Sequence, residues 1–553
     1  MKNRVVAFIV LCSTALAAAE WTFPAGKDPA SVFPPDQALA FPDGFKATVR
    51  FSCDLGKIDR RTRFGNLFCR GADFHDGYCV MVRYDGFLLI DILGVDPQYY
   101  MHPTKLESNR EYLLELYVTK SAVRVFIDGK ETGSFTHEGE LEFAKKSTPL
   151  RIGSMGGYAF FGSLPYLKLE AISQITMPPG GPKPAPREAP RVQPRAQIKW
   201  SKTICKQPDC YIGWPTVCRL KNGDVLAVFS GDRDGHICPW GKVQMIRSSD
   251  EGESWSEPVT IANSPLDDRD AGIVQMPDGE LIVTWFTSMY WAKHMKNHPD
   301  WPRHLAKLAP ETVKQWTGDF LIRSRDDGRT WTKPEKLSNY AQTPHGPILL
   351  KDGALLQIGR TTTIADGNAN GRFAKTIITV SRSKDAGRTW EVLCPEIPAA
   401  PGENDAPGMF HEPHAVELVD GTLVGLVRYH GDDNCMRATR SVDGGKTWTT
   451  MEKTPMIGLP PHLLALPDGK LVNVYGRRIA QFGYGEFACI SDDGGKTWDA
   501  ENEIMLQPSS NDDLGYPASC LLPDGDLLTV YYQKRAPKEK PVLMATRWRV
   551  THE

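Results

Sequence analysis

An acidic and a basic residue stand at opposite ends of two neighbouring apolar runs in the stretch HEPHAVELVDGTLVGLVRYHG. Glu412 heads the first run, a turn over Val419–Gly421 follows, and Arg428 ends the second run. In an antiparallel hairpin the head of one strand lies beside the tail of the next, so both side chains belong to the open end. A carboxylate can accept a proton and a guanidinium can hold an anion, which makes this end a candidate site.

The hairpin pattern recurs along the second part of the chain, and a shorter element recurs with it. Six segments consist of an apolar run, a turn and another apolar run, and five of them precede an element of the form SxDxGxTW. In this element Asp can accept hydrogen bonds from turn amides, Gly can take a positive φ, and Trp can pack between sheets. Repeats of about four strands that cannot bury both faces alone predict a six-bladed β-propeller over residues 198–553. The elements are SSDEGESW (248–255), SRDDGRTW (324–331), SKDAGRTW (383–390), SVDGGKTW (441–448) and SDDGGKTW (491–498).

Strand-like segments at the two ends of this part, IKWSKTI (198–204) and VLMATRWRV (542–550), are expected to share the closure of the ring. In a propeller, the loops that enter the innermost strands and those that leave the second strands open on one face around the axis. The loops in these positions are rich in arginine, histidine, tyrosine and carboxylate residues. This polar rim is therefore where we expect the site.

The first part of the chain predicts an export signal and a separate domain. Residues 1–19 combine Lys2 and Arg4 with an apolar run and small residues, which is typical of a secretory signal peptide. Short alternating strands then predict a β-sandwich over residues 20–176, and a Pro-rich linker follows over 177–197. The fold class is therefore all-β, and the protein is expected to be exported, to the periplasm or the extracellular space.

Composition excludes two other classes of protein. A formal net charge of -2 gives no basic face for nucleic acid, and no later apolar run is long enough to span a membrane. Eleven cysteines remain after the signal. Cys205 with Cys210, or Cys53, Cys69 and Cys79 among themselves, could form disulfides or could equally be buried thiols.

The five SxDxGxTW elements are Asp boxes, and with six hairpins they resemble the sialidase (neuraminidase) superfamily of BNR-repeat proteins. The segment AVRVFIDGKETGSF and the strands after it resemble the concanavalin-like (laminin-G-like) jelly roll. The resemblance implies an exo-glycosidase that hydrolyses terminal sialic acid or a related acidic sugar, with no cofactor. Its partners would be sialylated or other acidic glycans, such as mucin-type glycoconjugates, and the Asp boxes would support the fold without taking part in catalysis.

Three residues match the pattern of catalytic residues in this superfamily. Its members use a tyrosine nucleophile because a carboxylate nucleophile would be repelled by the carboxylate of the sugar. Tyr516 matches this tyrosine, Glu412 matches the glutamate that takes its proton, and Arg428 matches one arginine of the carboxylate-binding cluster.

The chain departs from the superfamily in the first blade. An Arg-Ile-Pro triplet is expected there, whereas this chain has Gly213–Trp214–Pro215. Arg233 or Arg269 could supply the missing guanidinium, and Arg477 or Arg478 could complete the cluster, with Arg477 favoured. The remaining substrate-binding candidates on the rim are Trp214 and Asp270.

The acid/base residue is expected on a loop of the first or second blade. Asp232, Asp234 and Asp270 are the carboxylate candidates, with Asp234 favoured, and His236 stands where an acidic loop residue is expected. Three further histidines recur at equivalent blade entries, namely His345, His414 and His462. They could contact sugar hydroxyls, transfer protons or simply be satisfied polar side chains.

An insertion in the second blade (288–319) is expected to form a lid whose Trp291 and Trp301 contact sugar. His294 and His298 are one helical turn apart, but no acidic third ligand follows, so no metal site is predicted. Two alternatives to hydrolysis stay open. A polysaccharide lyase acting on uronate-containing glycans would suit the His-rich rim, and a glycan-binding propeller without catalysis would need no acid/base residue.

Overall fold

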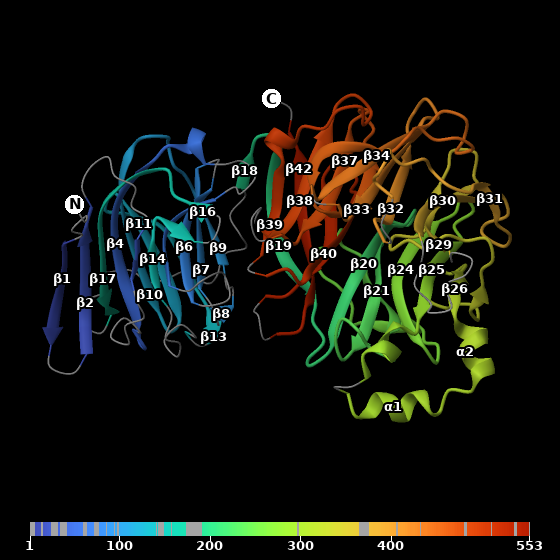
Figure 1. The fold of residues 1–553 in the computed structure, drawn as a ribbon, viewed down its shortest axis with the longest axis horizontal. Helices are drawn as coiled ribbons and strands as arrows, with labels where there is room; N and C mark the ends of the chain where they lie inside the picture. The colour runs from blue at the N-terminus through green and yellow to red at the C-terminus, as the bar shows by residue number, and fades with distance from the viewer. Residues whose placement is uncertain are drawn as a thin grey trace.

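Strands are the predominant regular structure of the described residues, and two short α-helices lie at one edge (Figure 1). The structure is a computed structural model. It describes residues 6–12, 15–23, 31–33, 41–58, 64–70, 77–83, 86–92, 95–96, 99–139, 141, 149–155, 158–172, 178, 191–295, 298–363, 375–404, 408–431, 433–479, 484–509, 511–535 and 539–551. This architecture confirms the prediction of an all-β fold.

Six antiparallel sheets form the second part of the molecule, and we number them as blades one to six. Blade one is β20 (Tyr211–Arg219), β21 (Val225–Arg233), β22 (Lys242–Ser248) and β23 (Val259–Ala262); blade two is β24 (Asp267–Gln275), β25 (Leu281–Ser288), β26 (Gly318–Ser324) and β27 (Glu335–Lys336); blade three is β28 (Ile348–Leu349), β29 (Leu355–Thr363), β30 (Lys375–Ser383) and β31 (Glu391–Cys394). Blade four is β32 (Phe410–Glu417), β33 (Leu423–Tyr429), β34 (Cys435–Ser441) and β35 (Glu452–Ile457); blade five is β36 (Leu459–Ala465), β37 (Leu471–Arg477), β38 (Gly485–Ser491) and β39 (Ile504–Pro508); blade six is β40 (Leu514–Leu521), β41 (Leu527–Gln533) and β42 (Val542–Val550), joined by β19 (Ala196–Cys205) and β18 (Arg191–Gln193).

The blades close into a ring. The inner strands contact one another in sequence, β20 with β24, β32 with β36 and β36 with β40, and β40 returns to β20. Blade three joins the ring through β28 and β29, which contact β24 and β32 respectively. The two ends of the propeller meet in blade six, where β19 pairs with β42 and Ile198 lies opposite Trp548. The predicted sharing of ring closure by these two segments is confirmed.

The Asp boxes form turns between the third and fourth strands of blades one to five, and their composition predicts such turns. In the first box Asp250 Oδ1 accepts from the Ser254 amide at 2.8 Å, and Gly252 has a φ of 91°. A Cβ on Gly252 would lie 2.8 Å from Leu528 of blade six, so the glycine also permits close packing between blades. Trp255 Nε1 donates to the Gly252 carbonyl at 3.1 Å and fixes the ring over this contact.

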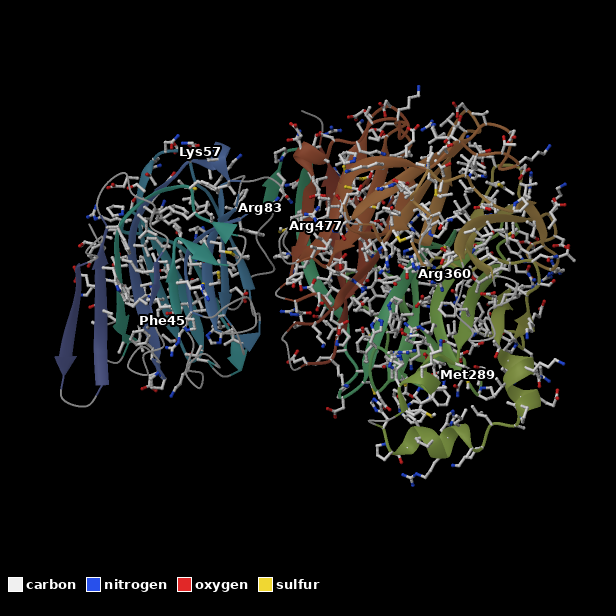
Figure 2. The ribbon with its side chains drawn as sticks, in the orientation of Figure 1. Phe45, Lys57, Arg83, Met289, Arg360 and Arg477 are labelled. Carbon is white, nitrogen blue, oxygen red and sulfur yellow. The ribbon has the colours of Figure 1, made fainter. Side chains whose placement is uncertain are left out.

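The first part of the chain is a sandwich of two antiparallel sheets around one core, which Phe45 marks in Figure 2. One sheet has the order β1 (Val6–Cys12), β2 (Ala15–Thr22), β17 (Gly162–Ala171), β4 (Gly44–Cys53), β10 (Glu111–Thr119), β11 (Ala122–Ile127), β12 (Lys130–Thr136). The other has the order β3 (Ser31–Phe33), β14 (Leu150–Ile152), β5 (Phe64–Arg70), β6 (Tyr78–Arg83), β7 (Phe87–Ile92), β9 (Tyr99–Lys105). Two strand pairs, β8 (Val95–Asp96) with β13 (Glu138–Gly139) and β15 (Ser154–Met155) with β16 (Tyr158–Ala159), and the short helix η2 (Leu55–Lys57) complete this part.

The sandwich packs against blade five of the propeller. Met81 and Leu89 of the sandwich share an apolar cluster with Leu463 and Met505 of that blade. Arg83 lies on the side of the sandwich that faces the propeller (Figure 2), and its guanidinium donates to the Gln193 side chain. Gln193 Nε2 in turn donates to the Met505 carbonyl at 2.9 Å, so β18 joins the two parts through hydrogen bonds as well as apolar contact.

The segment predicted to be removed as a signal peptide lies at the edge of the first sheet. Among the described residues β1 pairs with β2 alone, and β2 pairs with β17 from Ala18 to Thr22. Loss of residues 1–19 would therefore remove β1 and the first five residues of β2, and would leave the pairing of β17 with β4 in place. Export and the concanavalin-like affiliation of the sandwich stay predictions.

The end of the predicted linker is structured. Residues 191–193 and 196–197, placed in the linker by their composition, are strand residues of β18 and β19, and most of the remaining linker lies outside the described residues. Cys53, Cys205 and Cys210 are free thiols, and the Cys79 thiol donates to Asn66 Oδ1 at 3.2 Å. Within the described ranges, each helix is too short or too polar to cross a membrane.

Candidate active site

The inner strands share a backbone irregularity that aims side chains at the propeller axis. In four blades the pairing of the inner strand shifts register near its start, and a non-glycine residue with positive φ stands at the shift. Such a conformation costs on the order of 1 kcal/mol or more per residue and is concentrated at functional sites. These residues are Trp214 (φ 54°), Asp270 (52°), Glu412 (40°) and Tyr516 (52°).

Two of these four strained residues form the central contact of the site. The Tyr516 hydroxyl donates to Glu412 Oε1 at 2.6 Å. Burial alone would raise the pKa of Glu412, but the Arg428 guanidinium and the Tyr516 hydroxyl outweigh it and lower that pKa to about 2. Burial, and then the charge of Glu412, hold the pKa of Tyr516 well above its usual range. At neutral pH the pair is therefore a phenol beside a carboxylate that can accept its proton.

Three guanidinium groups surround this pair. Arg428 forms an ion pair with Glu412 through Nη1, which also lies 3.4 Å from the Tyr516 hydroxyl. Arg478 lies 5.3 Å from the centre of the Tyr516 ring and donates through Nη2 to the Tyr532 hydroxyl at 2.7 Å. Arg269 stacks on Trp214, with its Cζ 4.3 Å from the ring centre. The Trp214 ring in turn lies 6.4 Å from that of Tyr516, so it connects Arg269 with the Tyr516–Glu412 pair.

The balance of charge around Tyr516 favours an anionic ligand. Arg269, Arg428 and Arg478 are opposed by Glu412, which is ionised, and by Asp270, whose pKa burial raises to about 6. Glu486 also interacts with Arg478, and burial holds its pKa well above its usual range. An acidic sugar would therefore find an excess of positive charge beside the tyrosine.

Arg233, a candidate for the missing guanidinium, is engaged elsewhere. It is 1% exposed, and its Nη1 and Nη2 donate to the two carboxylate oxygens of Asp267 at 2.5 and 3.0 Å. Its Nη2 also donates to the His236 carbonyl at 3.2 Å. Arg233 therefore supports the rim from behind, and Arg269 is the candidate that reaches the site.

Replacement of Asp267 by Asn tests this structural role. The change leaves Arg233 buried without a counter-charge, and we expect it to lower the free energy of unfolding by about 3–5 kcal/mol. The denaturant midpoint of the intact chain measures this effect. Asp300→Asn, which breaks an exposed ion pair with Arg303 on the insertion, should change stability by less than about 0.5 kcal/mol. Equal midpoints for the wild type and Asp267→Asn would show that the buried pair does not hold the rim.

The choice of Arg477 over Arg478 is corrected by the structure. Arg477 is 3% exposed, donates through Nη2 to Glu503 Oε1 at 2.6 Å and through Nε to the Ile457 carbonyl at 2.9 Å. It therefore lies in the interior of blade five. Arg478 follows it at the end of β37 and is the arginine that faces Tyr516 and Tyr532.

The three carboxylate candidates for the acid/base role have different surroundings. Asp232 pairs with Lys242 on the outer part of blade one, and its φ of 54° is also positive. Asp234, the favoured candidate, is exposed. Its backbone amide donates to the Cys238 thiol at 3.5 Å, and its backbone carbonyl accepts from Lys540. Asp270 is 7% exposed, with its amide held by Ser230 Oγ at 3.0 Å. Its charge acts on both Glu412 and Tyr516, which places Asp270 beside the Tyr516–Glu412 pair.

His236 is exposed at the rim, and its ring is held in place. Its Nδ1 lies 3.1 Å from the Tyr211 hydroxyl, and the edge of the ring packs on Trp214 at 5.0 Å between centres. The Arg269 Nη1 donates to its carbonyl at 3.0 Å. The structure therefore brings His236 into the same cluster as Trp214 and Arg269.

The three rim histidines lie inside the propeller and link its blades. His414 Nδ1 accepts from the Leu463 amide at 3.0 Å, and His462 Nδ1 accepts from the Ser519 amide at 3.4 Å, each on the next blade. His345 lies 3.3 Å from Thr216 Oγ1 of blade one and 6.4 Å, ring to ring, from Tyr516. The three are 3–8% exposed, and burial lowers the pKa of each, that of His462 to about 4. We assign them to packing beneath the site, in place of the predicted contact with sugar.

The insertion of blade two is a small packed unit whose tryptophans face inward. It contains η5 (Tyr290–Lys293), α1 (Asp300–Leu305) and α2 (Pro310–Trp316), near the residue labelled Met289 in Figure 2. Trp291 and Trp301 are 0% and 2% exposed and contact each other, which corrects the prediction that they contact sugar. His304 of the insertion packs on Trp240 of the blade-one loop, so the insertion supports the loop that carries His236.

The sequence did not single out three side chains of this cluster, Tyr211, Asp513 and Tyr532. Asp513 accepts from the Tyr211 hydroxyl at 2.6 Å, and Tyr532 lies within 6.2 Å of Tyr516, ring to ring. Their signal in the sequence is their position beside the loop entries and exits, which they share with the predicted site residues.

No group of three or more histidine, cysteine or acidic side chains in the described part of the chain is arranged to hold a metal ion.

Comparison with known proteins gives one family match and two named relatives. The BNR repeat-like domain family matches residues 225–529. A sialidase of Bacteroides fragilis (strain YCH46) is 25% identical over 360 residues, which cover 58% of this chain and 59% of the relative. A sialidase of Clostridium perfringens is 23% identical over 256 residues, which cover 44% of this chain and 61% of the relative. The match thus spans about three fifths of each relative's length.

A solved structure supports the fold of the propeller part. A protein of unknown function from Dyadobacter fermentans DSM 18053 is 25% identical, with a TM-score of 0.54. The similarity covers 65% of this chain and 100% of that protein.

Proposed function

Since the chain belongs to the family of BNR repeat-like domains, we propose that it is a sialidase-like exo-glycosidase acting on terminal acidic sugars. The observation that carries this proposal is the 2.6 Å hydrogen bond from the Tyr516 hydroxyl to Glu412, set among three arginines. The two sialidase relatives support the same class of reaction. Its substrates would be sialylated or other acidic glycans, including mucin-type glycoconjugates, met by an exported enzyme.

Tyr516 and Glu412 would carry out the covalent step. As the phenolic oxygen attacks the anomeric carbon, its proton passes to Glu412 Oε1, and the bond to the leaving oxygen breaks. A neutral phenol approaches a sugar that bears a carboxylate without the repulsion a carboxylate nucleophile would meet. Arg428, which contacts both the glutamate and the phenol, would stabilise the negative charge that develops on the phenolic oxygen.

Arg269, Arg428 and Arg478 would hold the sugar carboxylate. In this arrangement blade two supplies the guanidinium that the superfamily pattern places in blade one, where this chain has Gly213–Trp214–Pro215. Gly213 stands at the position of that arginine, and the following residue, Trp214, presents its ring face to Arg269 at 4.3 Å. The carboxylate cluster would thus be rebuilt from a neighbouring blade.

Product analysis tests the class of reaction. The wild-type chain is incubated with sialyllactose, with mucin glycans and with a uronate-containing polysaccharide, and the products are separated. Free sialic acid is the expected product. An unsaturated uronate, which absorbs ultraviolet light, would instead identify a lyase, and the absence of any product beside measurable glycan binding would identify a binding module.

Substitution of Arg269 tests the rebuilt carboxylate cluster. We expect Arg269→Ala to raise KM for sialyllactose by about 10- to 100-fold, because charge-assisted hydrogen bonds contribute about 1.5–3 kcal/mol. Wild-type enzyme should also prefer sialic acid over its methyl ester as an inhibitor, and the variant should lose much of that preference. Arg303→Ala on the insertion, where the guanidinium is 74% exposed, is the matched control. An unchanged preference in Arg269→Ala would show that blade two does not bind the carboxylate.

A further inference from the structure

His236 belongs to a hydrogen-bonded chain that crosses from blade one to blade six. The Tyr211 hydroxyl lies between His236 Nδ1, at 3.1 Å, and Asp513 Oδ1, at 2.6 Å. Asp513 also pairs with Lys534, at 3.1 Å. Tyr211 is 3% exposed, whereas the imidazole is exposed at the rim, so the chain runs from the interior to the surface that a substrate would meet.

The hydrogen-bond donors in this network determine which imidazole nitrogen of His236 carries the proton. A carboxylate accepts only, so the Tyr211 hydroxyl donates to Asp513 and its oxygen is left as an acceptor. The Nδ1 of His236 must then donate to Tyr211. The neutral ring consequently presents the lone pair of Nε2, and the charged ring presents an Nε2–H.

The backbone of His236 is also held from two sides. Arg233 and Arg269 both donate to its carbonyl, at 3.2 and 3.0 Å. Trp214 packs against the ring and against Tyr516. A histidine that served only to solvate the rim would not need to be oriented by a tyrosine, a tryptophan and two arginines.

We propose that His236 exchanges a proton with the leaving group, and that Tyr211 and Asp513 position its ring for that exchange. This inference rests on the proposed glycosidase function. Nε2 donates its proton to the oxygen that departs from the anomeric carbon while Tyr516 forms the new bond. When water later attacks the glycosyl–tyrosine bond, Nε2 takes a proton from that water and the phenol leaves with the proton held by Glu412.

The competing carboxylates fit this role less well. Asp234 is exposed, its amide donates to the Cys238 thiol at 3.5 Å, and its carbonyl accepts from Lys540. Asp270 is buried, and its charge acts on Glu412 and Tyr516, which form the nucleophile pair. The largest charge effects on His236 come from Arg269, Arg478, Asp513 and Arg233.

Binding of an acidic sugar would favour the charged form of His236. In the free protein, desolvation by the neighbouring rim side chains, and then the guanidinium groups of Arg269 and Arg478, lower its pKa, while Asp513 raises it. A substrate carboxylate placed on the same two arginines would offset their charge and let the imidazole gain its proton. The acid is then generated when the correct ligand is bound.

Leaving groups of different acidity test the proposal on the full chain. The two substrates are sialyllactose, whose leaving sugar needs a proton, and 4-nitrophenyl sialoside, whose phenolate leaves without one. We expect His236→Ala to lower kcat/KM by about 10²- to 10⁴-fold for sialyllactose and by less than about tenfold for the aryl glycoside. His294→Ala, an exposed histidine on the insertion, is the control and should behave as the wild type on both.

The pH profile of Asp513→Asn gives a second, independent readout. Asp513 favours the charged imidazole, so its removal lowers the pKa of His236, and the alkaline limb of kcat should move to lower pH. Equal losses on both substrates in His236→Ala, or an unmoved alkaline limb in Asp513→Asn, would overturn the proposal. Wild-type protein that hydrolyses neither substrate would instead overturn the proposed function on which it rests.

Discussion

Tyr516→Phe should lower kcat/KM for sialoside hydrolysis by at least about 10³-fold, because it removes the oxygen that attacks the anomeric carbon. The phenylalanine ring keeps the contacts with Trp214 and Tyr532, at 6.4 and 6.2 Å between centres, so the packing of the ring is preserved. Steady-state kinetics with sialyllactose measures the loss. The carboxylate-binding arginines are untouched, so binding of sialic acid should fall much less than turnover.

Tyr531→Phe is the matched control for this substitution. Tyr531 lies next to Tyr532 on β41, is 0% exposed, and its hydroxyl lies 2.8 Å from Thr546 Oγ1, away from the site. The change should lower stability by about 1 kcal/mol and leave kcat/KM close to the wild-type value. Substantial hydrolysis by Tyr516→Phe would remove the tyrosine from the role of nucleophile.

The second large effect is expected for Glu412→Gln, with a loss in kcat of about 10²- to 10⁴-fold. The amide cannot take the phenol proton, and Arg428 loses the carboxylate with which it pairs. Glu417→Gln on the same strand β32 is the control, since Glu417 accepts from the Lys351 amide at 2.7 Å on the far side of the hairpin. Activity in Glu412→Gln equal to that of the control would contradict the assigned role.

The low pKa of Glu412 also sets the acid side of the pH profile. Arg428 and the Tyr516 hydroxyl outweigh burial and lower that pKa to about 2, so the carboxylate stays ionised well below neutral pH. A carboxylate with a lowered pKa loses its function only as the pH falls through that value. Activity of the wild type should therefore persist into moderately acidic solution, as far as the chain stays folded.

The propeller and its central pair could be predicted because each depends on local spacing. Six hairpins and five Asp boxes recur in register, and a repeat of this length has few other ways to bury both faces. Glu412 and Arg428 meet because their hairpin pairs His411 with Arg428. Tyr516 occupies the equivalent position in blade six, so the same pattern placed it beside them.

Features that depend on the exact end of a strand could not be predicted. Successive residues of a strand face opposite sides, so a shift of one residue exchanges Arg477 with Arg478. β37 ends at Arg477, which leaves that side chain against Glu503 and turns the next one towards Tyr516. The sequence shows two adjacent arginines and gives no register by which to choose between them.

The sequence also does not show how deeply a side chain is buried or which side chain of another blade it contacts. Arg233 and Asp267 stand on different blades, and nothing in their spacing along the chain shows that they neutralise each other. His414 and His462 recur at the loop entries like Glu412 does, yet their rings turn beneath the site and stack at 4.3 Å. An equivalent position in a repeat therefore predicts at which end of its blade a residue lies, but not how deeply its side chain is buried.

Trapping of the glycosyl–tyrosine intermediate tests the central claim most directly. The wild-type chain is incubated with 2,3-difluorosialic acid, whose C2 fluoride leaves as the covalent bond forms and whose C3 fluorine slows hydrolysis of that bond, and its peptides are then analysed by mass spectrometry. We predict one added 3-fluorosialosyl group, located on Tyr516. An enzyme that hydrolyses sialyllactose but carries the label on another residue, or carries none, would contradict the assignment of Tyr516 and Glu412 as the catalytic pair.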